Sequence, residues 1–174
     1  MTVIDLLSEE FKQQMYALAS QACWSVAAGE GTGSVIGLDF GKKIPRVVPL
    51  TNLHLTEDQR YYKAEMSLFI ECAWRLDSRN EVICGSSDSD ANDGPMVRGL
   101  ALVVDQKVVS IELSELSWDV TIKFTGDLFL KVFCDQTNVE EEVSNYSLHL
   151  EDRIYTVGPR GKLNCGPRRW KHLR

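Results

Sequence analysis

Apolar and polar residues alternate along residues 62–76. The apolar positions of one parity are Tyr62, Ala64, Met66, Leu68, Ile70, Cys72, Trp74 and Leu76. Polar residues fill most positions between them, with Phe69 and Ala73 as the apolar exceptions. Because successive side chains of a strand point to opposite faces, the pattern predicts one long strand with a buried face and a solvated face. Such a strand is typical of an antiparallel sheet, since parallel sheets are normally covered on both faces.

Shorter apolar or alternating segments, separated by turn residues, continue the pattern after the glycines at 29, 31 and 33. The further strands that we predict are 34–40, 44–50, 81–84, 97–104, 108–113, 118–124, 128–134, 145–150 and 153–157. Hairpin turns are predicted at 105–107, 126–127 and 151–152. Pro45 and Pro49 favour an edge position for the second of these strands. Many short strands with regular turns predict a mainly β fold, an antiparallel β-sandwich or half-open barrel.

The first 28 residues follow a helical period instead. One apolar stripe recurs every three or four residues and consists of Leu7, Phe11, Met15, Leu18 and Ala22. Thr2 and Asp5 have the spacing of a capping box, which would satisfy free N–H groups of the first turn. We therefore predict an amphipathic helix over 1–28 that packs on the sheet.

Neither a linker nor an internal repeat divides the 174 residues, so we expect a single domain, 1–174, with a β core over 34–157 and a basic tail over 158–174. The tail holds six Lys and Arg residues and no acid, which leaves 13 basic against 25 acidic residues in 1–157, a charge of -12. A body with this charge repels nucleic acid and attracts basic partners.

The start of the chain lacks the basic and apolar regions of a signal peptide, and no apolar run approaches the roughly 20 residues that cross a bilayer. We therefore expect a cytoplasmic protein without membrane contact. The five cysteines form no CxxC pair. Reduced, buried cysteines are expected, because a disulfide framework or a zinc site would show paired spacings.

Two acidic clusters are candidate partner-binding sites. The first contains Asp88, Asp90 and Asp93 and resembles the start of a calcium-binding loop. That loop requires Gly at its sixth position and Glu at its twelfth, where this chain has Asp93 and Gly99, so we expect no metal site and no cofactor.

The second acidic cluster contains Glu140, Glu141 and Glu142 and is the densest in the sequence. It lies on a connection at one end of the predicted sheet, where binding loops usually lie. We expect both clusters to contact a basic protein partner.

No catalytic motif stands out. Asp119, Glu112 and His149 could meet in a cleft, and Cys134 could pair with His149 across neighbouring strands. Clean alternation instead predicts the three polar side chains on the solvent face, and Cys134 shares the parity of the apolar residues of 128–132. We therefore expect that the protein is no enzyme. We also expect that alanine at Asp119, Glu112 or His149 leaves folding and activity intact.

A small ligand-binding β-barrel remains an alternative, although the bulky inward positions favour a filled core.

Four segments together carry a family resemblance: Met66–Leu76 with its central Ala-Trp-Arg-Leu, Trp118–Phe124, Leu128–Asp135 and Asn145–Leu150. In these strand patterns the chain resembles small β-rich uncharacterised bacterial proteins, including immunity proteins of contact-dependent or polymorphic toxin systems. The resemblance implies a cytoplasmic binding protein that blocks a toxin domain by covering its active site. Together with the charge of -12 and the lack of a catalytic motif, it leads us to expect an immunity protein that neutralises a basic toxin, with a nuclease as the favoured target. It assigns no functional residue, because such proteins bind through surfaces that vary from pair to pair.

Overall fold

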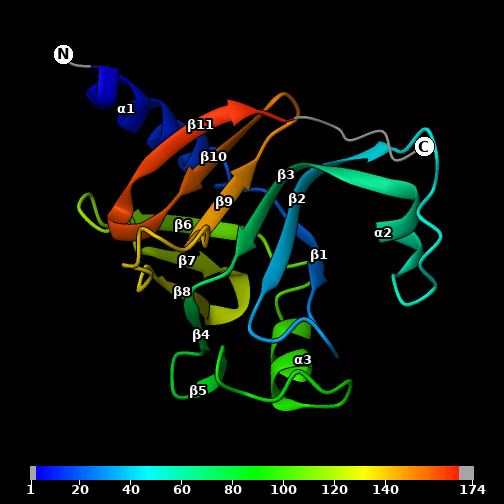
Figure 1. The fold of residues 1–174 in the computed structure, drawn as a ribbon. Helices are drawn as coiled ribbons and strands as arrows, with labels where there is room; N and C mark the ends of the chain where they lie inside the picture. Colours follow the sequence, from blue (N-terminus) through cyan, green and yellow to red (C-terminus); the bar gives the residue numbers. More distant parts are fainter. Residues whose placement is uncertain (1–2, 169–174) are drawn as a thin grey trace.

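Two antiparallel sheets, of six and five strands, pack against each other in the computed structural model, which describes residues 3–168 (Figure 1). The arrangement is sandwich-like and open, and a helix, α1 (Val3–Tyr16), precedes the first strand. This confirms the predicted fold class. The predicted capping residue Thr2 lies outside the described residues.

The six-stranded sheet has the order β1 (Cys23–Ala27), β2 (Ile36–Pro45), β3 (Tyr62–Ile70), β9 (Tyr146–His149), β10 (Arg153–Val157) and β11 (Leu163–Pro167). The five-stranded sheet has the order β5 (Val82–Gly85), β4 (Ala73–Asp77), β8 (Leu128–Phe133), β7 (Val120–Phe124) and β6 (Val108–Leu113). The remaining elements are α2 (Glu57–Tyr61), α3 (Pro95–Ala101), and the 3₁₀ turns η1 (Thr125–Asp127) and η2 (Pro159–Gly161).

The predicted long strand over 62–76 is two strands in different sheets. β3 ends at Ile70 and β4 begins at Ala73, and the chain bends between them (Figure 1). At the bend, the N–H groups of Glu71 and Cys72 both donate to the carbonyl of Asn145, at 2.9 and 3.0 Å. The predicted buried face is correct on both sides of the bend, because its residues from Ala64 to Leu76 line the core.

Asn145 holds this junction with its side chain as well. The fully buried side chain accepts a hydrogen bond at Oδ1 from the N–H of Gln136 (3.0 Å) and donates from Nδ2 to the carbonyl of Gly158 (2.8 Å). Its own N–H donates to the carbonyl of Val157 at 2.8 Å. One residue therefore connects the bend between the sheets, the segment after β8 and the end of β10.

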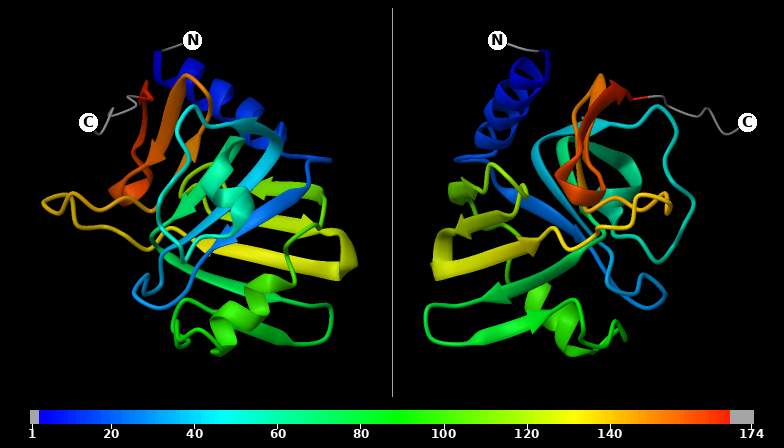
Figure 2. Two further views of the ribbon diagram at one scale, coloured as in Figure 1. Left: turned by 90° about the vertical axis from the view of Figure 1, so that its right-hand side faces the viewer. Right: turned by 60° about the vertical axis from the view of Figure 1, so that its left-hand side comes forward.

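Helix α1 covers an open side of the sandwich (Figure 2) and contacts β6 of one sheet and β11 of the other. Phe11 packs edge-on against Trp118, with ring centroids 5.2 Å apart, and contacts the ring of Tyr155 at 5.8 Å. Between the sheets, Phe40 stacks on Phe124 at 6.5 Å. Large apolar side chains fill this interior, as expected for a core rather than for a ligand-binding barrel.

The helix is shorter than predicted. α1 ends at Tyr16, and residues 23–27 form β1 instead of a last helical turn. Ser20 has a positive φ of 68°, which a helix interior excludes. The stripe from Phe11 to Leu18 is buried as predicted.

The prediction of a strand over 97–104 is wrong, because most of this segment belongs to α3. Pro95 occupies the first turn of that helix, a position that favours proline. Met96, Leu100 and Val103 then lie at helical spacing and are buried. The hairpin predicted across 105–107 is therefore absent from the described residues, and β6 pairs with β7.

Two further boundaries differ from the prediction. β2 continues through a bulge to Pro45, so 46–50 is a loop rather than a second strand. The predicted basic tail contains β11, which pairs with β10. The hairpins β7–β8 and β9–β10 are confirmed. Over residues 3–168, no helix combines the length and the apolar character that crossing a bilayer requires.

We expect Asn145→Ala to lower the free energy of unfolding by about 2–4 kcal/mol, because it leaves the half-buried N–H of Gln136 and the buried carbonyl of Gly158 without their partners. Equilibrium urea unfolding measures this loss. Asn138→Ala is the matched control, since Asn138 makes two similar local hydrogen bonds in an exposed loop. Equal losses in the two variants would contradict the central role of Asn145.

Candidate partner-binding surface

Three loops gather at one end of the sandwich, residues 114–119, 134–145 and 158–162, at the left of Figure 1. We call them the loop surface. The N–H and the guanidinium Nε of Arg160 donate to the carbonyls of Gln136 (3.0 Å) and Thr137 (3.1 Å). Gly161, with φ +71°, lies so close to the carbonyl of Leu116 that a Cβ atom would be 2.8 Å from that oxygen. The three loops are therefore held together by direct contacts.

The loop surface presents apolar side chains in an acidic surrounding. Leu116 is 90% exposed and Val139 is 65% exposed. The acidic residues of the three loops are Glu115, Asp119, Asp135, Glu140, Glu141 and Glu142. Arg160 and Lys162 are the basic residues of the same loops. The combination of exposed aliphatic groups and carboxylates suits a basic protein partner.

Glu115 is tied to the first helix. Lys12 on α1 donates to Glu115 Oε1 at 2.7 Å and to Glu9 at 2.9 Å. The ammonium group lowers the pKa of Glu115 below its ordinary value. This carboxylate therefore stays charged, and the ammonium group of Lys12 partly neutralises its negative charge.

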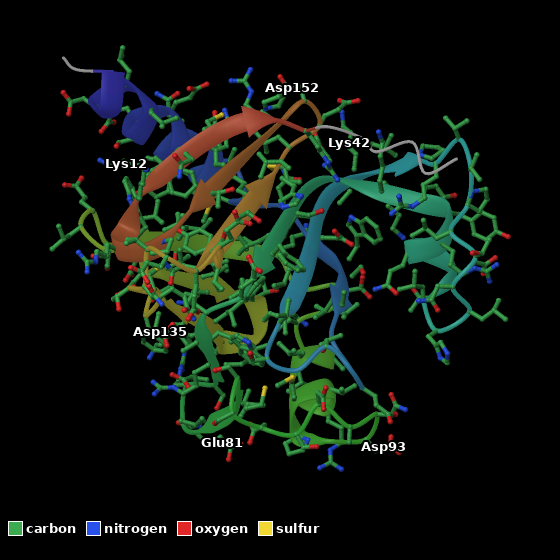
Figure 3. The ribbon with its side chains drawn as sticks, viewed as in Figure 1. Lys12, Lys42, Glu81, Asp93, Asp135 and Asp152 are labelled. Atoms are coloured by element: carbon green, nitrogen blue, oxygen red, sulfur yellow. The ribbon has the colours of Figure 1, made fainter. Side chains whose placement is uncertain are left out.

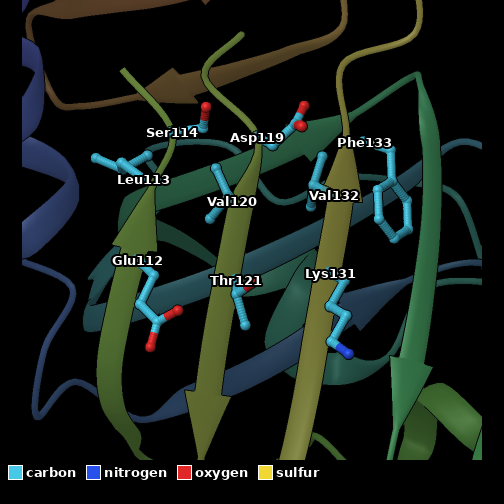
Figure 4. A pocket seen from close by; sticks show the side chains of 9 residues that line it. All are labelled: Glu112, Leu113, Ser114, Asp119, Val120, Thr121, Lys131, Val132 and Phe133. Carbon is cyan, nitrogen blue, oxygen red and sulfur yellow. The ribbon is translucent and has the colours of Figure 1, made fainter. Parts of the chain in front are cut away.

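A groove of about 390 Å³ runs from the loop surface along the outer face of the five-stranded sheet (Figure 4). Its nine lining residues are Glu112, Leu113, Ser114, Asp119, Val120, Thr121, Lys131, Val132 and Phe133. Lys131 Nζ forms an ion pair with Asp77 at 2.9 Å, so the carboxylate partly neutralises the positive charge of Lys131. The ionisable side chains of the lining are Glu112, Asp119 and Lys131.

The Asp119 side chain is half-buried and binds the backbone at the end of a neighbouring strand instead of facing solvent freely. Its Oδ1 accepts a hydrogen bond from the N–H of Cys134 at 2.7 Å, and its carbonyl accepts from the N–H of Ser114 at 2.9 Å. Glu112, by contrast, is exposed as predicted. The expectation that Asp119→Ala leaves folding intact is therefore revised.

His149 belongs to a polar row on the outer face of the six-stranded sheet. Ser67 Oγ donates to Asp39 Oδ1 at 2.6 Å, and Ser147 Oγ lies 2.8 Å from His149 Nε2. Burial raises the pKa of Asp39 and lowers the pKa of His149. His149 is half-buried instead of freely exposed. Ser147 is only 7% exposed, so a substrate could not reach its hydroxyl in this conformation.

The cysteines are reduced, and Cys23, Cys72 and Cys84 are buried as expected. Cys134 is half-buried and packs on the core, whereas His149 lies on the outer face of the other sheet. The structure therefore does not bring Cys134 and His149 together. Cys165 on β11 is exposed.

The two predicted acidic clusters lie on different loops. Asp88 and Asp90 are half-buried in the loop that leads to α3, and their carboxylates organise that region. Asp88 accepts from the N–H of Gly85 at 2.8 Å, and Asp90 accepts from the N–H groups of Gly31 and Gly33 at 3.0 and 2.9 Å.

Asp93 is exposed near α3, far across the view from Asp135 of the loop surface (Figure 3). Glu140, Glu141 and Glu142 are exposed on the loop surface itself. Within residues 3–168, no three His, Cys, Asp or Glu side chains are grouped closely enough to hold a metal ion.

Sequence reasoning missed Leu116 and Val139. Each is a single aliphatic residue within a polar stretch, Ser-Glu-Leu-Ser and Asn-Val-Glu. The available signal was a lone aliphatic residue among polar, turn-forming residues. Such a residue fits neither the period of a strand nor that of a helix, which indicates that it is not part of the core.

A second groove, of about 520 Å³, lies beside the end of β1 and includes His54 and Glu30.

We expect Asp119→Ala to lower the free energy of unfolding by about 1–2 kcal/mol, because the N–H of Cys134 loses its acceptor. Asp119→Asn keeps an acceptor oxygen and should lose less. Glu112→Ala, in the same groove but exposed, should stay within about 0.5 kcal/mol of the unmodified protein. Thermal and urea unfolding of the three variants provide the comparison, and an equal loss in all three would show that the hydrogen bond is unimportant.

No protein-family model, curated protein or solved structure matches this chain.

Proposed function

We propose that this chain is a non-enzymatic binding protein of the immunity type, which neutralises a basic toxin domain by covering its active site with the loop surface. The observation that carries the proposal is the exposure of Leu116 and Val139 among six carboxylates on three connected loops. A nuclease domain fits best as the target, because a protein that binds the phosphate backbone presents basic side chains at its active site.

Charge and apolar contact have separate roles in this proposal. The charge of -12 over residues 1–157 increases the rate of encounter with a basic protein and disfavours acidic competitors. Buried anchors supply most of the affinity in typical interfaces, and Leu116 and Val139 are the side chains available for that role. The acidic rim would then set orientation and partner choice.

Direct contacts link the three loops in the absence of a partner, which favours tight binding. Arg160 and Gly161 contact the other two loops, and Asn145 anchors the end of the longest one. Contacts of this kind reduce the conformational entropy lost on association. A preorganised surface is what a stoichiometric inhibitor requires.

A pull-down with the product of the adjacent gene tests the proposal directly. We expect a stable complex, and we expect co-expression of this chain to restore growth to cells that produce the neighbouring toxin domain. If that neighbour is no toxin and co-expression protects against none, the immunity function has no basis.

Replacing Glu140, Glu141 and Glu142 by Lys should slow association with the partner by roughly ten-fold or more at low salt, because the charge that steers encounter is reversed. Stopped-flow measurement at two ionic strengths checks this, and the difference should shrink at high salt. Lysine at Glu57, Glu81 and Glu151 is the control, with the same change in net charge on residues outside the loop surface. Equal slowing would mean that only net charge matters. An unchanged rate, together with loss of activity in His149→Ala, would favour an enzyme.

Replacing Leu116 by Ser should mainly raise the dissociation rate, by roughly ten-fold or more, because an apolar anchor is lost from the centre of the contact. Surface plasmon resonance separates the two rates. Val47→Ser is the matched control, since Val47 is fully exposed on the loop between β2 and α2, outside the loop surface. If Val47→Ser weakens the complex and Leu116→Ser does not, the partner binds elsewhere on the chain.

A further inference from the structure

Two cysteines lie opposite each other at the end of the β4–β8 pair. The register pairs Ala73 with Phe133 and Trp74 with Val132, so the next opposed positions are Cys72 and Cys134. Both side chains point inward, because Cys72 has the parity of Trp74 and Cys134 has the parity of Val132. The two thiols are therefore neighbours across adjacent strands.

The backbone hydrogen bonds show which kind of opposed pair this is. The N–H of Cys72 donates to the carbonyl of Asn145, and the N–H of Cys134 donates to Asp119 Oδ1. The two cysteines thus do not exchange backbone hydrogen bonds with each other. Side chains of such a non-hydrogen-bonded pair lie closer than those of a hydrogen-bonded pair. The separation of opposed Cβ atoms in such pairs approaches the roughly 3.5–4.5 Å that a disulfide spans.

We propose that Cys72 and Cys134 are an oxidisable dithiol, a site at which a small-molecule disulfide of the glutathione class introduces an intramolecular disulfide. The bond would connect the bend between β3 and β4 to the first residue of the 134–145 loop. Cys134 begins one loop of the loop surface, but the thiol chemistry of the pair can be tested without the partner.

The reaction balances as two successive thiol–disulfide exchanges. The half-buried Cys134 loses its proton to solvent, its thiolate attacks one sulfur of oxidised glutathione, and one glutathione thiolate leaves. The thiolate of Cys72, after losing its own proton, then attacks the Cys134 sulfur and expels the second glutathione. The protein loses two electrons and two protons, and one oxidised glutathione takes up both to become two reduced molecules.

Proximity of the two thiols also sets the conditions for the reaction. The pKa of the Cys134 thiol is raised above its ordinary range, mainly by its contact with the Cys72 thiol and secondly by burial. The thiolate is the attacking species, so exchange is slow at neutral pH and accelerates as the pH rises. The buried thiols of Cys23 and Cys84 have raised pKa values of about 12 and 11, and burial is the main cause.

The test uses the full chain with Cys165→Ser, which removes the exposed thiol. The reduced protein is incubated with oxidised glutathione at pH 8.5, denatured, alkylated and measured by intact mass and peptide mapping. We expect two fewer alkylated thiols, a cross-linked peptide pair containing Cys72 and Cys134, and a Tm higher by roughly 5–10 °C. A stable glutathione adduct on Cys134, an unchanged thiol count or a different cross-link would each overturn the proposal.

Two variants in the same background sharpen the result. With Cys72→Ala the reaction should stop at a glutathione adduct on Cys134, because the resolving thiol is gone. With Cys84→Ala, which removes another buried thiol, the Cys72–Cys134 cross-link should form as before. A cross-link that survives Cys72→Ala, or disappears in a folded Cys84→Ala protein, would show that the pair is wrongly assigned. None of these readouts involves the toxin partner, so a failure here leaves the proposed function untouched, and the reverse also holds.

Discussion

The carbonyl of Asn145, which accepts hydrogen bonds from two consecutive N–H groups, is the interaction on which the two-sheet arrangement depends. A strand that passes from one sheet to another must leave its ladder for a residue or two, and the N–H groups freed there are close to the core. Glu71 and Cys72 are those residues, and Asn145 supplies the acceptor for both. The side chain of the same asparagine then satisfies groups on two further segments. The bend, the start of the long loop and the end of β10 are consequently fixed together.

The same junction positions the loop surface. The 134–145 loop begins at Cys134, whose N–H is held by Asp119, and it ends at Asn145. Between these points Arg160 supports the loop from the neighbouring connection. Exposed carboxylates and aliphatic groups can thus be presented on a loop without the large entropy loss that a free loop of this length would incur on binding.

Sequence periodicity predicted the burial of residues 62–76 correctly but not their division between two sheets. The bend preserves parity, so the apolar residues of the predicted face, from Ala64 to Leu76, remain inward, and the pattern contains no sign of the change of sheet. The segment 97–104 failed for a different reason, since a short apolar run fits a strand and a buried helix alike. Its deciding residue was Pro95, at a position that begins a helix.

At the candidate site, the exposure of Glu140 to Glu142 followed from composition, whereas the internal role of Asp90 did not. Its partners, the N–H groups of Gly31 and Gly33, lie more than fifty positions away in the chain. Such long-range backbone contacts leave no periodic signal. Asp39, Ser67 and His149 are also aligned in one row only by the order of β2, β3 and β9, which local patterns do not encode.

The order of strands along the chain has a consequence for how the molecule forms during synthesis. All strands of the five-stranded sheet lie between positions 73 and 133, whereas the six-stranded sheet joins strands from before and after that segment. The five-stranded sheet is therefore an insertion, complete in itself, within an interrupted second sheet. Three of its four pairings join consecutive strands and can form early, whereas β4 must wait for β8, and β3 of the other sheet must wait for β9. Until then the apolar face of β1 to β3 has no finished sheet around it, and the last strands to emerge complete the enclosure of the core.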